Sequence, residues 1–389
     1  MSNTKLSFSQ LSQYMSCPKK YEYHYKHRLR EKTTSAALLW GTAIDETLTA
    51  ILQDHKKQRL DYLGQEYHII FTNNWRRGFI NKQNVELYNN ENIVYAASDF
   101  DGDLLLPGDL NMMVGMTQVG APYYGVGVLK EAEEALELVK SIKNEKEAKG
   151  WAKLKPVQRQ FYNHMHWLSM HRKGVILIDA YIKKIIPQVK EVLATQKQVE
   201  LVNEDGDAVI GYIDAILRWV DDRIVIFDHK TAAREYDWDA VLRSVQLTMY
   251  VHSVSEQFEN TRSAGYIVLR KQIEKNKTKK CTVCSHDGTG SRAKTCDNTV
   301  DGKRCGGEWK ERISPDGRID VLINEIPHRT EEIVMENLAD VNHQIKQGLF
   351  TRNLASCTSP FPCPFFKLCW NNSKEDLIDM NEEVKDEKK

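Results

Sequence analysis

The chain of 389 residues is 41% hydrophobic and 28% charged, and its 54 basic side chains equal its 54 acidic ones in number. These proportions are those of an ordinary soluble protein, and no apolar run approaches the ~20 residues of a transmembrane helix. A net charge of zero argues against a protein that only binds nucleic acid. The sequence has no Gly-x₄-Gly-Lys-Ser/Thr loop, which excludes an ATPase motor of that kind.

The N-terminus has no apolar run long enough for a secretory signal. We therefore expect a cytoplasmic protein, or one of the host cytoplasm if the protein is viral, with no membrane partner. Disulfides are rare in such a reducing compartment. The eight cysteines are then candidates for metal binding.

Two basic runs interrupt the neutral chain. Residues 19–32 interleave lysine and arginine with Tyr21, Tyr23 and Tyr25, and residues 270–280 hold six basic residues against one glutamate. Basic groups neutralise phosphates and aromatic rings stack on unpaired bases, so both runs are candidates for DNA contact. The alternative is solvated surface, with the tyrosines in a core.

From about Thr47 to Val189, apolar residues recur at helical intervals. We expect a large helical insertion here, which serves either as a lobe that guides DNA or as a scaffold. Three histidines cluster in it, His164, His166 and His171. We interpret them as surface or packing residues rather than ligands.

Two neighbouring segments rich in strand-forming residues, 208–219 and 223–232, predict a β-hairpin. A three-residue loop would set Asp214 directly opposite Asp228, with Cβ atoms roughly 5 Å apart. A two-residue loop would shift the register and place Asp214 less favourably. Side chains alternate along a strand, so Asp228 and Lys230 share one face.

Three ionisable groups in the middle of two apolar strands indicate a metal site. Close carboxylates raise each other's pKa, and a hard cation such as Mg²⁺ or Mn²⁺ removes that conflict. Such an ion polarises a phosphoryl oxygen and lowers the pKa of a bound water. Lys230 would place that water or neutralise charge on the phosphate. The alternative is a cluster of Asp–Lys–Asp ion pairs on an exposed strand face.

Four cysteines, Cys281, Cys284, Cys296 and Cys305, lie in a segment rich in Gly, Asp and Lys. A Cys-x-x-Cys pair followed by two more cysteines suits a structural zinc ion with tetrahedral ligands. The segment has little to bury, so it would need the metal to hold a shape. His286 could replace one thiolate, and a disordered loop is the other alternative.

The remaining four cysteines are split between the two ends of the chain. Cys17 lies near the start, and Cys357, Cys363 and Cys369 lie near the end. Residues 374–389 beyond them hold four lysines against seven acidic residues and few apolar groups. We expect this acidic tail to be disordered.

Five short motifs follow one another along the chain: Leu6-Ser-Phe-Ser-Gln-Leu, Trp40-Gly-Thr-Ala-Ile-Asp-Glu46, Gly211-x-x-Asp214, Asp228-x-Lys230-Thr and Gln246-x-x-x-Tyr250. Their order resembles the RecB-like branch of the PD-(D/E)XK nuclease superfamily. The resemblance covers the first 50 residues and the chain from about residue 191 onward. It implies an α/β fold with a restriction-endonuclease-like core, in which helices flank a central mixed sheet. The helical insertion and a small zinc-ribbon-like insertion would be additions to this core.

The resemblance also implies roles for matching positions. Asp214, Asp228 and the backbone carbonyl of His229 would ligate a Mg²⁺ or Mn²⁺ ion, and Lys230 would be the catalytic lysine. Gln246 and Tyr250, about one helical turn apart, would face the active site or the DNA. The alternative for that pair is ordinary helix packing with one polar contact.

Asp45 departs from the family, which has a metal-binding histidine at this position. An aspartate also ligates Mg²⁺ or Mn²⁺, so we expect Asp45 to join the metal ligands. The neighbouring Glu46 could substitute for it. The alternative for Asp45 is a polar helix residue without a ligand.

The one-plus-three arrangement of Cys17, Cys357, Cys363 and Cys369 resembles the iron–sulfur members of this branch, which include AddB and CRISPR-associated adaptation nucleases. The resemblance implies a 4Fe–4S cluster held by four thiolates, which would staple the two chain ends across the core. Both gaps between the last three cysteines are five residues, whereas the family has two and then five. Zinc and free thiols therefore remain alternatives.

The sequence and the resemblance thus predict a metal-dependent deoxyribonuclease of the exonuclease type. It would act on single-stranded DNA or DNA ends in recombination, repair or phage and mobile-element DNA processing. A separate helicase or recombination protein would be a partner. The alternative is an inactive nuclease fold that binds DNA or assembles complexes. The expected divisions are core residues 1–50, a helical insertion over 51–190, a core with the catalytic hairpin over 191–280, a zinc-binding insertion over 281–309, a C-terminal core with the cysteine cluster over 310–372 and a disordered acidic tail over 373–389.

Overall fold

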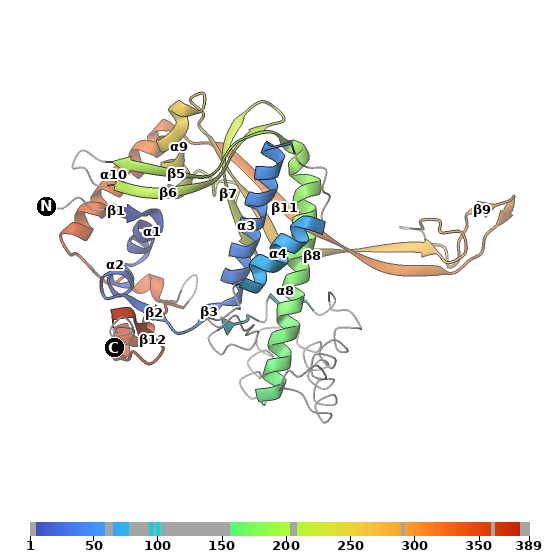
Figure 1. Ribbon diagram of the computed structural model, residues 1–389, viewed down its shortest axis with the longest axis horizontal. Helices are drawn as coiled ribbons and strands as arrows, with labels where there is room; N and C mark the ends of the chain where they lie inside the picture. Colours follow the sequence, from blue (N-terminus) through green and yellow to red (C-terminus); the bar gives the residue numbers. More distant parts are fainter. Residues whose placement is uncertain are drawn as a thin grey trace.

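The computed structural model describes residues 5–58, 65–77, 93–96, 99–101, 104, 156–202, 208–288, 292–358 and 362–381. A six-stranded sheet forms the centre, and helices lie on both of its faces (Figure 1). The α/β core expected from the sequence, a mixed sheet flanked by helices, is confirmed. Among the described residues, no helix is both long enough and apolar enough to cross a membrane.

The strands of the central sheet are β1 (Lys5–Ser7), β5 (Val189–Val202), β6 (Ala208–Trp219), β7 (Ile224–Ala232), β8 (Ser263–Cys281) and β11 (Trp309–Glu325). Their order is β1-β6-β7-β8-β11, and β5 also pairs with β6. The pairs β1–β6 and β7–β8 are parallel, and the others are antiparallel. The sheet is therefore mixed.

Strand β6 changes partner along its length, and this opens the sheet at one point. Residues 208–210 pair with β1 and residues 215–218 pair with β7, while β5 follows β6 throughout. In the described part of the sheet, residues 211–214 thus have a ladder to β5 and none to β1 or β7. These four residues are the Gly-x-x-Asp motif.

Helices cover the sheet through two apolar cores. On one face lie α3 (Ala36–Lys56) and α8 (Pro156–Lys184) with α4 (Gln65–Arg77), and on the other lie α1 (Phe8–Ser16) and α9 (Val245–Val254) with α10 (His328–Lys346). Strand β7 contributes side chains to both cores, because Phe227 belongs to the first and Ile226 to the second. A strand buried on both faces has a continuous apolar run rather than an alternation.

The shorter elements complete the chain. They are α2 (Pro18–Tyr21), the π-helical turn η1 (Glu22–Lys26), the 3₁₀ turns η5 (Ile186–Gln188), η6 (Ser255–Gln257) and η7 (Leu354–Cys357), α11 (Phe366–Asn371), and the strand pairs β2 (Leu29–Glu31) with β12 (Leu377–Asp379), β3 (Thr34–Ser35) with β4 (Ile93–Val94) and β9 (Thr299–Val300) with β10 (Lys303–Arg304).

Strands β8 and β11 are long, with 19 and 17 residues. They pair antiparallel out to Cys281 and Trp309 and form an arm that leaves the body of the molecule (Figure 1). The ladder continues through the basic run because its backbone pairs while many of its side chains remain in water. The segment expected as an insertion over 281–309 forms the tip of this arm.

The expected boundaries need two corrections. The boundary at residue 50 falls inside α3, because Ile51 and Leu52 are buried and continue its apolar face. The tail expected to be disordered over 373–389 contains β12, which pairs with β2 and buries Leu377 in a small apolar cluster with Leu29. That apolar side chain and a free strand edge order the segment in spite of its charge. Residues 382–389 lie outside the described residues.

The histidines of the helical region take packing positions. His166 is buried, and His171 stacks against Trp167. The side chain of His164 lies outside the described residues. Tyr21 of the first basic run is also buried, which favours the core interpretation for that tyrosine.

Candidate active site

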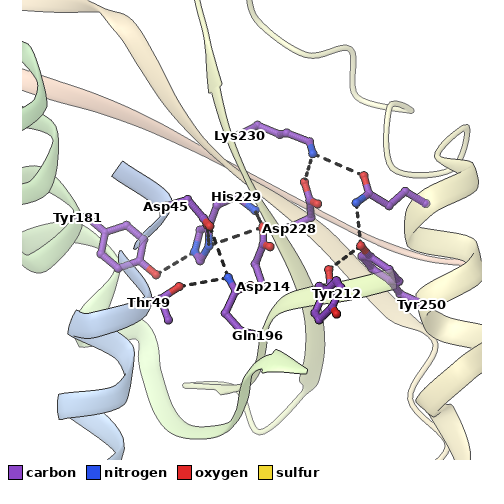
Figure 2. Close-up of polar contacts among 11 residues, drawn as sticks. Asp45, Thr49, Tyr181, Gln196, Tyr212, Asp214, Asp228, His229, Lys230 and Tyr250 are labelled. Carbon is purple, nitrogen blue, oxygen red and sulfur yellow. Dashed lines mark hydrogen bonds and ion pairs between the residues drawn. The ribbon is translucent and has the colours of Figure 1, made fainter. Parts of the chain in front are cut away.

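The β6–β7 hairpin carries the two aspartates that the sequence singles out (Figure 2). The first pair of its ladder, beside the turn, is Arg218 with Ile224, and the last pair is Ala215 with Phe227. The ladder therefore ends one residue before Asp214 and Asp228. The pairing leaves a loop of the three residues 220–222, as the preferred register requires. At the end of the ladder, Asp214 Oδ2 accepts the backbone N–H of His229 at 2.7 Å. The two carboxylates therefore stand where the strands part.

On one face of β7, Asp228 and Lys230 lie side by side, as strand alternation predicts. Lys230 Nζ is 2.5 Å from Asp228 Oδ2 and donates to Gln246 Oε1 at 3.5 Å. Gln246 Nε2 donates to Tyr250 Oη at 2.8 Å, and Tyr250 Oη donates to the carbonyl of Tyr212 at 2.6 Å. Helix α9 and strand β6 thus hold the lysine through a short chain of polar contacts (Figure 2).

Gly211 explains how close α9 lies to β6. A Cβ atom at this position would be 2.7 Å from Cε1 of Tyr250 and 2.8 Å from Cε of Met249. Any larger residue would push Tyr250 away from the strand. The glycine of the Gly-x-x-Asp motif is therefore required by packing against the helix that orients Lys230.

On the other face of β7, His229 turns its ring towards α3 and α8. Its Nε2 lies 3.1 Å from the hydroxyl of Tyr181, and its Nδ1 lies 3.9 Å from Asp45 Oδ1 and 4.0 Å from Asp214 Oδ2. One ligand atom from each of Asp45, Asp214 and His229 lies within 4.8 Å of the other two. Such a group has the size of a site for one metal ion.

The sequence predicted the backbone carbonyl of His229 as a metal ligand but did not predict a role for its imidazole. Alternation along Asp228-His229-Lys230 was the available signal, because it puts the ring on the face opposite the lysine. The interpretation also missed Tyr181 and Gln196. Gln196 Nε2 donates to Asp45 Oδ2 at 3.4 Å.

The site opens onto a pocket of about 240 Å³ between α3 and the strands. Gly41 and Asp45 line it from α3, and His229, Lys230 and Thr231 line it from β7. Both ends of the polar constellation therefore reach the same open space. The Gly-Thr-Ala-Ile-Asp motif and the Asp-His-Lys-Thr motif, far apart in sequence, form its two walls.

A comparison with models of protein families matches residues 5–88 and 123–369 to the PD-(D/E)XK nuclease superfamily. The chain belongs to this superfamily. The matched ranges include each residue of the constellation from Asp45 to Tyr250, and the mixed sheet is the restriction-endonuclease-like core of the superfamily. A search of the curated proteins found no match.

PD-(D/E)XK nucleases use divalent metal ions, and the residues of this site fit one. Among the described residues, neither Asp45 Oδ1 nor His229 Nδ1 has a hydrogen-bond partner, although both atoms are buried. Buried polar atoms nearly always have partners. Two such atoms, 3.9 Å apart beside the carboxylate of Asp214, are suited to bind a cation.

The pKa values agree with this fit. Burial, with the charges of Asp214 and Asp228, raises the pKa of Asp45 to about 7. Burial raises the pKa of Asp228 to about 6 against the opposing charge of Lys230, and burial raises the pKa of Asp214 as well. Burial lowers the pKa of His229 to about 4, so that its ring is neutral near pH 7. A cation would favour the ionised carboxylates, and a neutral imidazole is able to ligate it.

Lys230 stays charged in this site. Burial by itself would lower the pKa of Lys230, but the charge and hydrogen bond of Asp228, with the charge of Asp214, raise it above its ordinary value. The side chain of Lys230 is 34% exposed. It therefore presents a permanent positive charge to whatever enters from the pocket side.

The four cysteines at the tip of the arm form a compact group. Cys281 Sγ is 3.6 Å from Cys305 Sγ, Cys284 Sγ is 3.6 Å from Cys296 Sγ, and all four sulfur atoms lie within 4.8 Å of one another. Tetrahedral zinc with Zn–S bonds of about 2.3 Å separates its sulfur ligands by about 3.8 Å. The group has the geometry of a single-ion site. His286, the alternative ligand, is not part of it.

The other four cysteines meet as well, but more loosely. Cys17, Cys357, Cys363 and Cys369 line one cavity between α2 and the C-terminal segment. They are not among the groups of described residues whose ligand atoms all lie within 4.8 Å of one another. Two of the sulfur atoms accept hydrogen bonds from N–H groups. The backbone N–H of Asn353 donates to Cys17 Sγ at 3.5 Å, and Nε of Arg352 donates to Cys369 Sγ at 3.1 Å.

Proposed function

We propose that this protein is a metal-dependent deoxyribonuclease that hydrolyses phosphodiester bonds. The observation that carries the proposal is the constellation at the opening of the sheet. The carboxylates of Asp45 and Asp214 and the neutral imidazole of His229 surround one point, and Asp228 stands beside them with the charged Lys230. An inactive scaffold would gain nothing from this arrangement, because burial and mutual repulsion of the carboxylates make their ionised forms costly.

A Mg²⁺ or Mn²⁺ ion held by Asp45, Asp214, Asp228 and His229 would polarise a phosphoryl oxygen and lower the pKa of an attacking water. The chain's own residues supply the rest. Lys230, fixed by Asp228 and α9, provides positive charge where negative charge grows on the phosphate. A positive charge that is already held in place stabilises the transition state, because no protein group has to move as the reaction proceeds. The backbone carbonyl of His229 stays a predicted further ligand.

The substrate preference is a finer part of the proposal. Single-stranded DNA or DNA ends, exonuclease action and a partner helicase or recombination protein all rest on the resemblance to the RecB-like branch. The pocket is open and lined by both motifs, which supports access by an extended strand. Comparing linear with circular single-stranded DNA distinguishes the two modes, because an exonuclease leaves the circle intact.

The test uses purified protein, end-labelled single-stranded DNA and Mn²⁺ or Mg²⁺. Asp228→Ala and Lys230→Ala should each reduce cleavage by about a hundredfold or more. The matched controls are Asp222→Ala and Lys190→Ala, which break an exposed ion pair at the far end of the same hairpin. They should cleave at the wild-type rate.

Two outcomes would contradict the proposal. Full cleavage by both site variants would indicate a contaminating nuclease or another site. No cleavage with any divalent ion, by folded protein that binds DNA, would favour the inactive DNA-binding module instead.

We further propose that Cys17, Cys357, Cys363 and Cys369 hold a 4Fe–4S cluster and that the compact group at the arm tip holds zinc. The wider spacing of the first set supports this assignment, because a cluster of four irons needs more room than one ion. The N–H groups that point at Cys17 and Cys369 suit thiolate sulfur. A second zinc ion remains the alternative outcome.

A further inference from the structure

The arm formed by β8 and β11 concentrates positive charge in a neutral chain. Its outer part, residues 275–312, holds ten lysines and arginines against five acidic residues. This excess of positive charge lies on the arm, which extends from the body of the molecule (Figure 1) and has no apolar core of its own. The charge therefore does not serve folding of the arm, since like charges on one element repel.

Six of these cations are exposed and form no ion pair with any residue that the structure describes: Lys280, Arg292, Lys294, Lys303, Arg304 and Lys310. Lys280 and Lys310 lie on the two strands of the arm, Arg292 and Lys294 lie in the segment before β9, and Lys303 and Arg304 form β10. Elsewhere many basic side chains pair with acids, as Lys190 does with Asp222. The arm is thus a surface of uncompensated charge.

One cross-strand pair is a specific signal. Lys280 and Lys310 stand directly opposite each other in the β8–β11 ladder. Two like charges in opposed positions destabilise a sheet. An anion that lies between the two ammonium groups would remove this cost, and the phosphates of nucleic acid supply such anions.

The cysteine group gives the arm tip its shape. Cys281 ends β8, and its backbone N–H donates to the carbonyl of His286 at 2.9 Å. Cys296 and Cys305 flank the β9–β10 turn that carries Lys303 and Arg304. A zinc ion bound by the four thiolates would hold these segments together, so that the cations would sit on a preorganised surface.

The chemistry of the arm favours double-stranded over single-stranded DNA. Proteins that hold single strands use aromatic side chains on which bases stack. Residues 275–312 contain no Phe or Tyr, and their one Trp, Trp309, packs over Gly288 and donates to the carbonyl of Ala293. Phosphate contact without base stacking suits a duplex, whose bases are already stacked.

The length of the arm also suits a duplex. From Ile273 to Cys281, β8 extends about 27 Å at ~3.4 Å per residue. A duplex advances ~3.4 Å per base pair, so the arm can follow about eight base pairs.

We propose that the β8–β11 arm binds the phosphate backbone of duplex DNA next to the strand that the active site cleaves. The position of the duplex beside a cleaved strand rests on the proposed nuclease function, whereas duplex binding by the arm does not depend on it. Recognition would be independent of sequence, because phosphate contacts carry no base information.

The test measures binding by fluorescence anisotropy on the full chain carrying Asp228→Ala, which prevents cleavage. The double change Lys280→Gln with Lys310→Gln should weaken binding to a labelled duplex by about tenfold. The slope of log K against log salt should fall by about 1.8, or ~0.9 for each lost phosphate contact. Binding to single strands should change little. Lys57→Gln with Lys190→Gln, two exposed lysines off the arm, is the matched control.

Zinc content and circular dichroism show whether each variant is folded. Unchanged duplex affinity and salt slope in a folded arm variant would overturn the inference. An equal loss for single strands and duplex would overturn the choice of duplex. Failure of the nuclease proposal looks different, because wild-type protein would then leave DNA intact while the arm variant still loses duplex affinity.

Discussion

Asp228, His229 and Lys230 show how three consecutive residues serve two sides of one site. The strand sends the acid and the amine towards α9 and the imidazole towards α3. Asp214 joins the two sides, because its carboxylate reaches across the opening to the N–H of His229. Because β6 and β7 separate at this point, residues on opposite faces of β7 belong to one site.

Asp45 provides a prediction at this scale. Burial raises its pKa from 3.8 to about 7, so the folded protein binds a proton more tightly than the unfolded chain. The ionised carboxylate then destabilises the metal-free fold, increasingly as pH rises from 3.8 and fully above about 7. Asp45→Asn should raise the Tm at pH 8 in EDTA by a few degrees, roughly, and change it little near pH 4.

Added Mn²⁺ should reverse the order of the two proteins. An ion that binds only the folded state stabilises it, so the Tm of the wild type should rise and that of Asp45→Asn should rise much less. Thermal melts with and without Mn²⁺ measure both effects, and exposed Asp222→Asn is the control. An equal response to Mn²⁺ in Asp45→Asn would remove Asp45 from the ligands.

The sequence predicted part of this site for a clear physical reason. Asp228 and Lys230 interrupt an apolar strand that is buried on both faces, and such an interruption needs a chemical cause. The ring of His229 was missed because its surroundings depend on tertiary structure. Tyr181 comes from a helix 48 residues earlier, and no local pattern announces that contact.

Helix α9 is the element that controls the lysine. It packs on β6 without a side chain at Gly211, which lets Tyr250 reach the carbonyl of Tyr212. Gln246, one turn away, reaches Lys230 from the same face. The Gln-x-x-x-Tyr spacing therefore works as a brace between strand β6 and the amine of Lys230.

Gly211→Ala tests the brace. The added methyl would lie within 2.8 Å of Tyr250 and Met249, so we expect a loss of about 1–3 kcal/mol in unfolding free energy and a larger fractional loss of cleavage. Urea unfolding and initial cleavage rates measure the two. Gly348→Ala is the control, since φ is 69° there and strain alone would destabilise it. If both variants lose activity only in proportion to stability, α9 does not position the lysine.

Element lengths were the weakest part of the sequence prediction. Residues 271–281 have a lysine-rich pattern without strand alternation, so nothing indicated that β8 continues through them. Pairing with β11 decides the matter, and pairing is a property of two segments rather than one. The strand at 377–379 escaped prediction for the same reason, because its partner β2 lies at the opposite end of the chain.

At the scale of the whole molecule, two cysteine groups occupy two distant places. One shapes the tip of the arm, and the other joins α2 to the C-terminal segment. The division of the eight cysteines into four and four could be predicted from spacing alone. Which metal each group would hold could not be predicted, because that depends on distances between sulfur atoms that only the fold sets.

Metal analysis provides the prediction at this scale. Protein purified without oxygen should be brown and contain one zinc and about four iron atoms per chain. Cys363→Ser should lose the iron and the colour but keep the zinc, and Cys296→Ser should do the reverse. Each variant is the control for the other. Colourless protein with two zinc ions per chain would instead assign zinc to both groups.

Cys17 shares a cavity with Cys357, Cys363 and Cys369, and β2 pairs with β12 near the other end of the chain. A ribosome adds about 5–20 residues per second, so roughly 20 to 70 seconds separate the appearance of Cys17 from that of its companions. During that interval its thiol waits alone in the nascent chain, open to oxidation or to a chaperone. A cofactor that needs all four cysteines would therefore bind only after most of the polypeptide has been made.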